Sequence, residues 1–323
     1  MNRSPQEELV HFLGDLYSVE QQALAQLKSA PDAINLGDQL GNDFRRHHAE
    51  TEGQAEAVLH RLEELGGSPS TVEDVIMKVG GKGFLLFAKL QPESPGRLVA
   101  HAYSYESMEW AGYQMLKRLA DAIGDETTER LADRIGAEEA QMMKRLERGF
   151  DDAEELSHCG QSSDELQEQV CKHLAEAHAL EFQAIKLCER SQQIAGANEM
   201  QVLYDRISET SRQHAEQIEQ RLSHLRSSPS TLKDGALRMA GLNWSVFFQA
   251  QSDTPMKLAA FVYAFLHLQI AGYQLLRRSA ERVGNPETQR LCITLLDTKN
   301  TQSRQLAEAF GTAVKSTLHV QHS

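Results

Sequence analysis

The chain has 323 residues and a formal net charge of -13, with 41% hydrophobic and 24% charged residues. An acidic chain repels nucleic acid and anionic lipid, so we expect neither nucleic acid nor membrane as a partner. We find no run of about 18 apolar residues that would span a bilayer, no N-terminal secretory signal, and no Cys-x-x-Cys pair among the four cysteines, so we expect a cytoplasmic protein with free thiols.

Long amphipathic helices account for the first half of the chain. Apolar residues recur there at helical spacing, and glycine and proline interrupt the pattern. The predicted helices span residues 5–29, 36–65, 96–123 and 126–155. Residues 71–89 are too apolar for an open loop, so we expect a short helix inside the long connection between helices two and three. One long crossover between two helix pairs is the topology of ferritin-like four-helix bundles.

The first and third predicted helices carry glutamates on otherwise apolar faces. On the first helix, leucines recur at helical spacing along one face, and Glu20 occupies the one position of that face without a leucine. On the third helix, Glu109 lies between Tyr105 and Gly112 on the apolar face. Glu106 lies one turn earlier, at the edge of the same face. A lone carboxylate on a buried face is costly unless it is paired or binds a metal. The leucines of the first helix's face are Leu9, Leu13, Leu16, Leu24 and Leu27.

The second and fourth predicted helices add further oxygen-bearing side chains. Glu138 and Glu139 both fall within the inward arc of the fourth helix, and Glu139 fits the apolar spacing better. In the second helix the buried seam includes His48, and Glu50 and Gln54 flank it. All four helices therefore contribute to one layer at mid-height of the bundle.

The composition of this layer favours a dinuclear metal site. Four carboxylates balance the charge of two divalent ions, and hard oxygen ligands suit iron or manganese. Two alternatives stand beside this interpretation: a structural hydrogen-bond network, and glutamates that face solvent.

The chain repeats itself at an offset of about 160 residues. Ser-Pro-Ser-Thr and Ala-Gly-Tyr-Gln each occur twice, at residues 68–71 and 228–231 and at residues 111–114 and 271–274. Ordered matches at one offset indicate a duplication. We predict an all-α chain of two tandem four-helix bundles, the first at residues 1–158 and a degenerate second at residues 163–323, joined by a small polar linker.

The second copy has lost most of the carboxylates. Glu181, the counterpart of Glu20, survives, but Lys299 stands where the first copy has Glu139. The other replacements are Glu50 to Thr210, Gln54 to His214, Glu106 to Leu266, Glu109 to Gln269 and Glu138 to Thr298.

These losses predict a second bundle without a dinuclear site. We expect the ammonium of Lys299 to pair with Glu181 in the core instead. We expect His178 and His214 to be packed or hydrogen-bonded, with a single weak metal site as the alternative.

Four motifs lie on the predicted helices of the first half. They are Asp-Leu-Tyr-Ser-Val-Glu-Gln-Gln at 15–22, His-His-Ala-Glu-Thr-Glu-Gly-Gln at 47–54, Glu-Ser-Met-Glu and Ala-Gly-Tyr within 106–113, and Ala-Glu-Glu at 137–139. In order and spacing they resemble the motifs of the YciE/YciF-type ferritin-like stress proteins. The resemblance covers residues 1–155 well and residues 163–315 weakly. It implies a compact antiparallel bundle, usually dimeric, with a two-metal centre and a link to stress responses.

The resemblance also implies a set of metal ligands. The candidates are Glu20, Glu50, Glu106, Glu109 and Glu139, with Gln54 as a neighbour or weak ligand. Met143 stands where the family commonly has a further acidic residue, and Met142 stands where true ferritins have a histidine. We therefore do not expect the ferroxidase speed of ferritins.

Dimerisation of single-domain relatives suggests a use for the second copy. It would act as a built-in partner of the first bundle, giving an intramolecular pseudo-dimer, and a higher homo-oligomer is the alternative. The apolar segments 83–87 and 244–248 occupy equivalent places in the two crossovers. They are candidates for the interface, and ordinary core packing is the competing interpretation.

Two functions are compatible with these observations. The first is a stress protein that binds two iron or manganese ions in the first bundle and handles peroxide, oxygen or excess metal. Tyr17, Tyr103, Tyr105 and Tyr113 lie on or near its core helices, where packing is a simpler role than electron transfer. The second is a metal-free helical scaffold or interaction protein derived from a ferritin-like ancestor.

Overall fold

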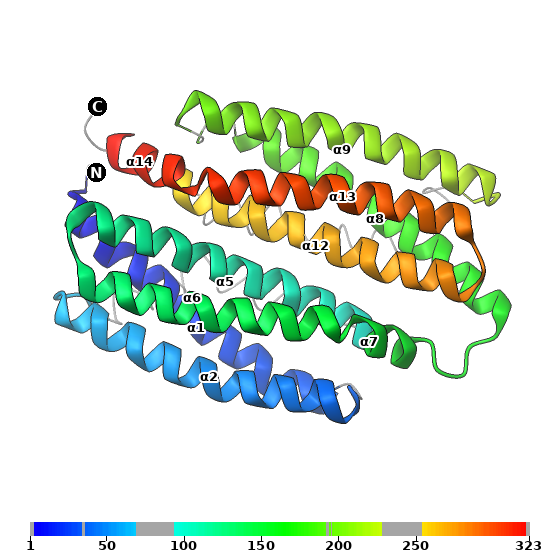
Figure 1. Ribbon diagram of the computed structural model, residues 1–323, viewed down its shortest axis with the longest axis horizontal. Helices are drawn as coiled ribbons and strands as arrows, with labels where there is room; N and C mark the ends of the chain where they lie inside the picture. Colours follow the sequence, from blue (N-terminus) through cyan, green and yellow to red (C-terminus); the bar gives the residue numbers. More distant parts are fainter. Residues whose placement is uncertain are drawn as a thin grey trace.

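The computed structural model describes residues 3–33, 36–68, 94–191, 194, 196–227 and 254–320. Every regular element among them is an α-helix, and the helices form two consecutive bundles, which confirms the predicted fold class (Figure 1). The first bundle consists of α1 (Pro5–Ala33), α2 (Gly37–Glu64), α5 (Pro95–Ile123), α6 (Glu126–Arg148) and α7 (Phe150–Ser157). The second consists of α8 (Ser163–Ser191), α9 (Asn198–His224), α12 (Pro255–Arg282), α13 (Pro286–Glu308) and α14 (Phe310–Val320). The predicted crossover helix and the segments 83–87 and 244–248 lie outside the described residues.

Equivalent capping residues start equivalent helices in the two copies. Ser94 caps α5 by accepting a hydrogen bond from the backbone N–H of Arg97, and Thr254 caps α12 in the same way. A proline follows each cap at the first helical position, where its missing N–H costs nothing. Asp125 and Asn285 cap α6 and α13 with their side-chain oxygens. The duplication is therefore preserved at the helix ends.

The fourth predicted helix of the first half is two helices. A break at Gly149 separates α6 from α7, whereas the sequence analysis predicted one helix over residues 126–155. A Cβ at Gly149 would lie 2.9 Å from Cδ1 of Leu40, so the backbone there sits directly against α2. The second copy breaks at the same place, after α13, and Phe150 and Phe310 open the two short helices.

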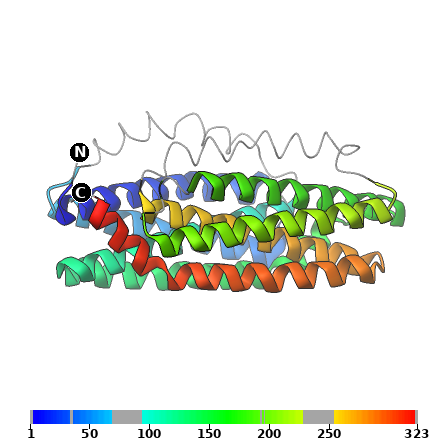
Figure 2. The ribbon, with the colours of Figure 1, turned by 90° about the horizontal axis from the view of Figure 1, so that it is seen from above.

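The two bundles pack side by side through their central helices, α5 and α12. The long helices of both bundles run along the long axis of the molecule (Figure 2). Oγ of Ser104 donates to the carbonyl oxygen of Ala264 at 2.8 Å, and these two residues are counterparts in the repeat. Trp110 of α5 stacks on Tyr263 of α12 with ring centroids 5.2 Å apart. Contact between counterparts is what an approximate two-fold axis between the copies produces.

Ion pairs and the terminal helices extend this contact on both sides. Nζ of Lys257 in the second bundle lies 2.8 Å from Asp15 in the first. The counterparts of these two residues in the repeat, Arg97 and Glu176, form an equivalent ion pair between the bundles. The short helix α7 reaches α12, and α14 reaches α5. Each of the two large apolar clusters contains residues from both copies, so the interface is continuous with the cores.

One helix has the length and composition of a membrane span. The sequence analysis found no such segment, but α12 passes that test over the described residues. Of its most apolar window, 89% is buried inside the protein, because α12 packs on its own bundle and on α5. Its hydrophobicity is accounted for by core packing.

Candidate metal centre

Four glutamates from three helices form a buried polar layer in the first bundle. Glu20 comes from α1, Glu106 and Glu109 from α5, and Glu139 from α6, and none is more than 2% exposed. Apolar side chains cover the layer on both sides along the bundle axis. The helical spacing had predicted that these four residues face inward, and their burial agrees with it.

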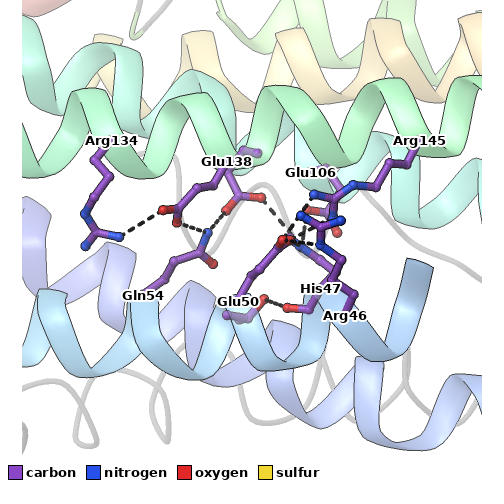
Figure 3. Close-up of polar contacts among 10 residues, drawn as sticks. Arg46, His47, Glu50, Gln54, Glu106, Arg134, Glu138 and Arg145 are labelled. Atoms are coloured by element: carbon purple, nitrogen blue, oxygen red, sulfur yellow. Dashed lines mark hydrogen bonds and ion pairs between the residues drawn. The ribbon is translucent and has the colours of Figure 1, made fainter. Parts of the chain in front are cut away.

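His47 of α2 completes this layer. Its Nε2 atom lies 2.8 Å from Oε2 of Glu106 and 3.7 Å from Oε2 of Glu139. One ligand atom from each of the three residues lies within 4.8 Å of the others, the spacing of a group that can hold a metal ion. Figure 3 shows His47 directed from α2 toward Glu106 and the α6 helix.

The prediction that His48 lies on the buried seam of the second helix is wrong. His48 is 28% exposed at its side chain and lies beside Glu52, whereas His47 is buried. From Phe44, a step of three residues reaches His47 and a step of four reaches His48. Helical periodicity allows both steps, so the pattern alone did not separate them.

The carboxylates of the layer have free coordinating atoms. Four oxygen atoms in it are buried and have no hydrogen-bond partner, which is a costly arrangement for a polar group in a protein interior. They are Oε2 of Glu20, both oxygens of Glu109 and Oε2 of Glu139, whereas Oε2 of Glu106 lies 2.8 Å from Nε2 of His47. Carboxylate oxygens and one imidazole nitrogen suit iron, manganese or zinc, so this donor set fits a metal.

Without a metal ion to neutralise the charge of this layer, the pKa values of its side chains shift. Burial raises the pKa of Glu20 to about 8, although the hydroxyl of Tyr113 donates to it. Burial and the neighbouring carboxylates raise the pKa values of Glu109 and Glu139 well above the usual range. Burial alone would lower the pKa of His47, but Glu106 outweighs it and raises the pKa. The metal-free cluster therefore retains protons at neutral pH.

Glu50, also a predicted ligand, has a different environment. Arg145 donates from Nη1 to Oε2 at 2.8 Å and from Nη2 to Oε1 at 3.1 Å, and Arg46 donates to Oε1 at 3.0 Å. Nδ1 of His47 lies 3.4 Å from Oε2. The hydrogen bond with His47 and the guanidinium of Arg145 hold the pKa of Glu50 far below its usual value. Glu50 is 22% exposed and lies beside the cluster, with both of its oxygens already in use.

Gln54 connects the layer to the surface. Its Nε2 atom donates to Oε1 of Glu139 at 2.6 Å and to Oε2 of Glu138 at 3.0 Å. Glu138 is 30% exposed and accepts a hydrogen bond from Arg134 at 3.0 Å. Of the two adjacent glutamates, Glu139 faces the core, as its better fit to the apolar spacing indicated.

A close approach of two helices sets the position of Glu20. A Cβ at Gly112 would lie 2.8 Å from Cδ2 of Leu16, so the glycine lets α5 lie directly against α1. Across this contact Tyr113 donates to Glu20, and the hydroxyl of Tyr105 donates to the carbonyl of Val19 at 2.8 Å.

The second bundle has an ion pair at the equivalent height. Nζ of Lys299 lies 2.8 Å from Oε2 of Glu181, and both side chains are fully buried. The ammonium also donates to Oγ of Ser211 at 3.0 Å, and Tyr273 and His214 contact Oε1 of Glu181. Burial would raise the pKa of Glu181, but Lys299 and His214 lower it to about 2. The ion pair predicted from the sequence is confirmed.

The two histidines of the second bundle have separate surroundings. His214 contacts Glu181, with Nδ1 3.2 Å from Oε1, whereas the ring of His178 packs on Phe182 with centroids 4.9 Å apart. Within the described residues of this bundle, no group of three ligand-type side chains has the spacing of the His47 cluster.

Comparison with known proteins gives one finding. A family model described as "Domain of unknown function (DUF892)" matches residues 4–155 and again residues 165–319. No curated protein and no solved structure matches the chain.

Proposed function

The chain belongs to the DUF892 family, of which it carries two tandem copies, and we propose that its first bundle binds two divalent metal ions, iron or manganese. The observation that carries this proposal is the group of buried carboxylates around His47, in which four oxygen atoms have no hydrogen-bond partner. Burying four carboxylates is costly unless cations or protons neutralise them. Two divalent cations would neutralise all four.

The residues divide naturally between two ions. His47, Glu106 and Glu139 would hold one, since their ligand atoms already lie close together. Glu20 and Glu109 add three unpartnered oxygens to the same layer for the other. Gln54 orients Glu139 and Tyr113 orients Glu20, while the apolar layers on either side exclude water.

The physiological role that we propose is that of a ferritin-like stress protein in the cytoplasm. Support comes from the motifs of the first copy, which resemble those of the YciE/YciF-type stress proteins. Bound iron or manganese would supply redox chemistry toward peroxide or oxygen, or the site would take up excess metal. The protein's own contribution is a dry, fixed set of donors.

Metal content tests this proposal. Protein purified without chelator is expected to contain about two metal ions per chain by elemental analysis. The variant Glu106→Ala/Glu139→Ala is expected to lose most of them, because both glutamates lie beside His47 in the group of side chains that can hold a metal ion. The matched control is Glu181→Gln/Lys299→Met, which changes the equivalent layer of the second bundle and should leave the metal content unaltered.

The competing function is a metal-free scaffold or interaction protein. The second bundle favours it, since its polar layer is neutralised by Lys299 without any metal. Metal content well below one ion per chain, unchanged in Glu106→Ala/Glu139→Ala, would establish the scaffold and exclude the metal centre.

We further propose that the second bundle takes the place of a second subunit. Support comes from the α5–α12 contact, where the counterparts Ser104 and Ala264 meet. The expected result is a particle with the mass of one chain, 36.1 kDa, in analytical ultracentrifugation at micromolar concentration. A dimer that persists on dilution would contradict this expectation and favour the higher oligomer.

A further inference from the structure

His47 lies between two sets of carboxylates and uses a different ring nitrogen for each. Nε2 faces Glu106 and Glu139 in the buried layer, and Nδ1 faces Glu50 at the edge of the bundle. An ionised carboxylate only accepts hydrogen bonds, so the nitrogen that faces Glu50 carries a proton. Nε2 faces Glu106 at 2.8 Å, and a metal bound in the layer would take the place of the proton between them, so Nε2 is the nitrogen available to a metal.

Glu50 itself is fixed by Arg145. The guanidinium of Arg145 makes two hydrogen bonds, one to each oxygen of Glu50, and its side chain is only 8% exposed. Two-point pairs of this kind define the orientation of a carboxylate as well as its position. Figure 3 shows the side chain of Arg145 extending from α6 toward Glu50 and His47, which belong to α2.

We propose that Arg145 is a positioning residue of the metal centre: by holding Glu50 it fixes the His47 ring with Nδ1 toward Glu50 and Nε2 toward Glu106 and Glu139. This inference rests on the proposed metal function. It reassigns Glu50 from ligand to orienting partner, because both of its oxygens are engaged by Arg145, Arg46 and His47.

The second copy provides an internal comparison. His47, Glu50 and Arg145 are replaced together, by Ile207, Thr210 and Gln305. Thr210 hydrogen-bonds only within its own helix, to the carbonyl of Arg206 at 2.8 Å, among the contacts described for it.

Other interactions survived the duplication. Tyr273 donates to Glu181 as Tyr113 donates to Glu20, and Arg221 contacts Thr288 at 2.8 Å as Arg61 contacts Thr128. A bundle of this fold therefore forms without the Arg145–Glu50–His47 chain, and that chain was lost along with the buried carboxylates. The joint loss indicates that Arg145 serves the metal site, and the intact fold of the second copy indicates that folding does not require it.

The test uses Arg145→Gln, which introduces the side chain found in the second copy. Removing an orienting partner of a ligand histidine typically weakens metal binding about 10- to 100-fold, and we expect a loss in this range for Mn²⁺. The dissociation constant is measured by competition with a chelator. Arg130→Gln is the control: Arg130 also lies on α6 and pairs with a glutamate, Glu126, and both side chains are largely exposed.

A second measurement separates positioning from general destabilisation. In Zn²⁺-loaded protein, ¹⁵N NMR of the histidine rings is expected to show His47 with Nε2 bound to metal and Nδ1 protonated. Glu50→Gln keeps an acceptor for Nδ1–H and should preserve this pattern with a small loss of affinity. Glu50→Leu removes the acceptor and should reproduce the loss of Arg145→Gln.

The outcomes distinguish this inference from the proposed function. A parent protein that binds no metal overturns both. A parent that binds metal, with Arg145→Gln binding equally well or Arg130→Gln equally impaired, overturns the role of Arg145 alone. The same holds if His47 binds metal through Nδ1.

Discussion

Replacing Lys299 by methionine is expected to lower the free energy of unfolding by about 3–5 kcal/mol at neutral pH. The substitution leaves Glu181 fully buried without its cation, and it removes the hydrogen bond to Ser211. The volume of the side chain hardly changes, so the loss is electrostatic. Urea unfolding followed by circular dichroism measures it.

The double variant Glu181→Gln/Lys299→Met is expected to recover most of this loss. Removing both charges also removes the desolvation cost of the pair, which its mutual attraction only roughly offsets. Tyr273 and His214 still find an oxygen on the glutamine.

A surface lysine is the control for the change of charge. Lys172 pairs with Glu168 where both are largely exposed, and Lys172→Met should change stability by less than about 1 kcal/mol. If Lys299→Met proves as stable as the parent, Lys299 does not compensate Glu181 and the account of the second bundle is wrong.

Periodicity and the internal repeat predicted much of this arrangement because they report which face of a helix is buried. Glu20 and Glu109 interrupt apolar stripes, and a residue in such a position must point inward. The repeat offset then aligned Lys299 with Glu139 and Glu181 with Glu20, which led directly to the ion pair.

Partners across helices could not be predicted in the same way. Arg145 and Glu50 are separated by 95 positions, and nothing local in either helix indicates that they meet. Helical periodicity also fits a buried face shifted by one residue. For this reason the pattern predicted His48 on the buried face, where the structure has His47. The interface between the bundles could not be predicted from local sequence either. Both α5 and α12 are apolar around much of their surface, so the residues that face their own bundle cannot be distinguished by type from those that face the other bundle.

Ionisation of Glu20 is expected to destabilise the metal-free protein as the pH rises from about 4.5 to about 8. Burial raises the pKa of Glu20 from 4.5 to about 8, so in this window the folded state keeps a proton that the unfolded state has released. Stability then falls with rising pH, by about 1.4 kcal/mol per pH unit for each such proton. The raised pKa values of Glu109, Glu139 and His47 act in the same direction.

The second bundle responds to pH in the opposite sense and in a lower range. The pKa of Glu181 is lowered to about 2, so its contribution is complete above 4.5 and is lost as the pH falls toward 2. Between about pH 5 and about pH 8 its effect is constant, whereas buried histidines with lowered pKa values, among them His101, His173 and His267, contribute stability that rises with pH up to about 6.5. The change of slope that Glu20→Gln causes therefore reports the first bundle.

The measurement is urea unfolding of chelator-treated protein at about pH 5, 6.5 and 8. Glu20→Gln cannot ionise and should flatten the slope, whereas Glu7→Gln, at an exposed position, should not. Adding Mn²⁺ should restore stability most strongly at the highest pH, because metal and protons compete for the same oxygens. A slope that Glu20→Gln leaves unchanged would mean that the buried carboxylates are neutralised by some other group. The absence of a Mn²⁺ effect would then count against a metal centre as well.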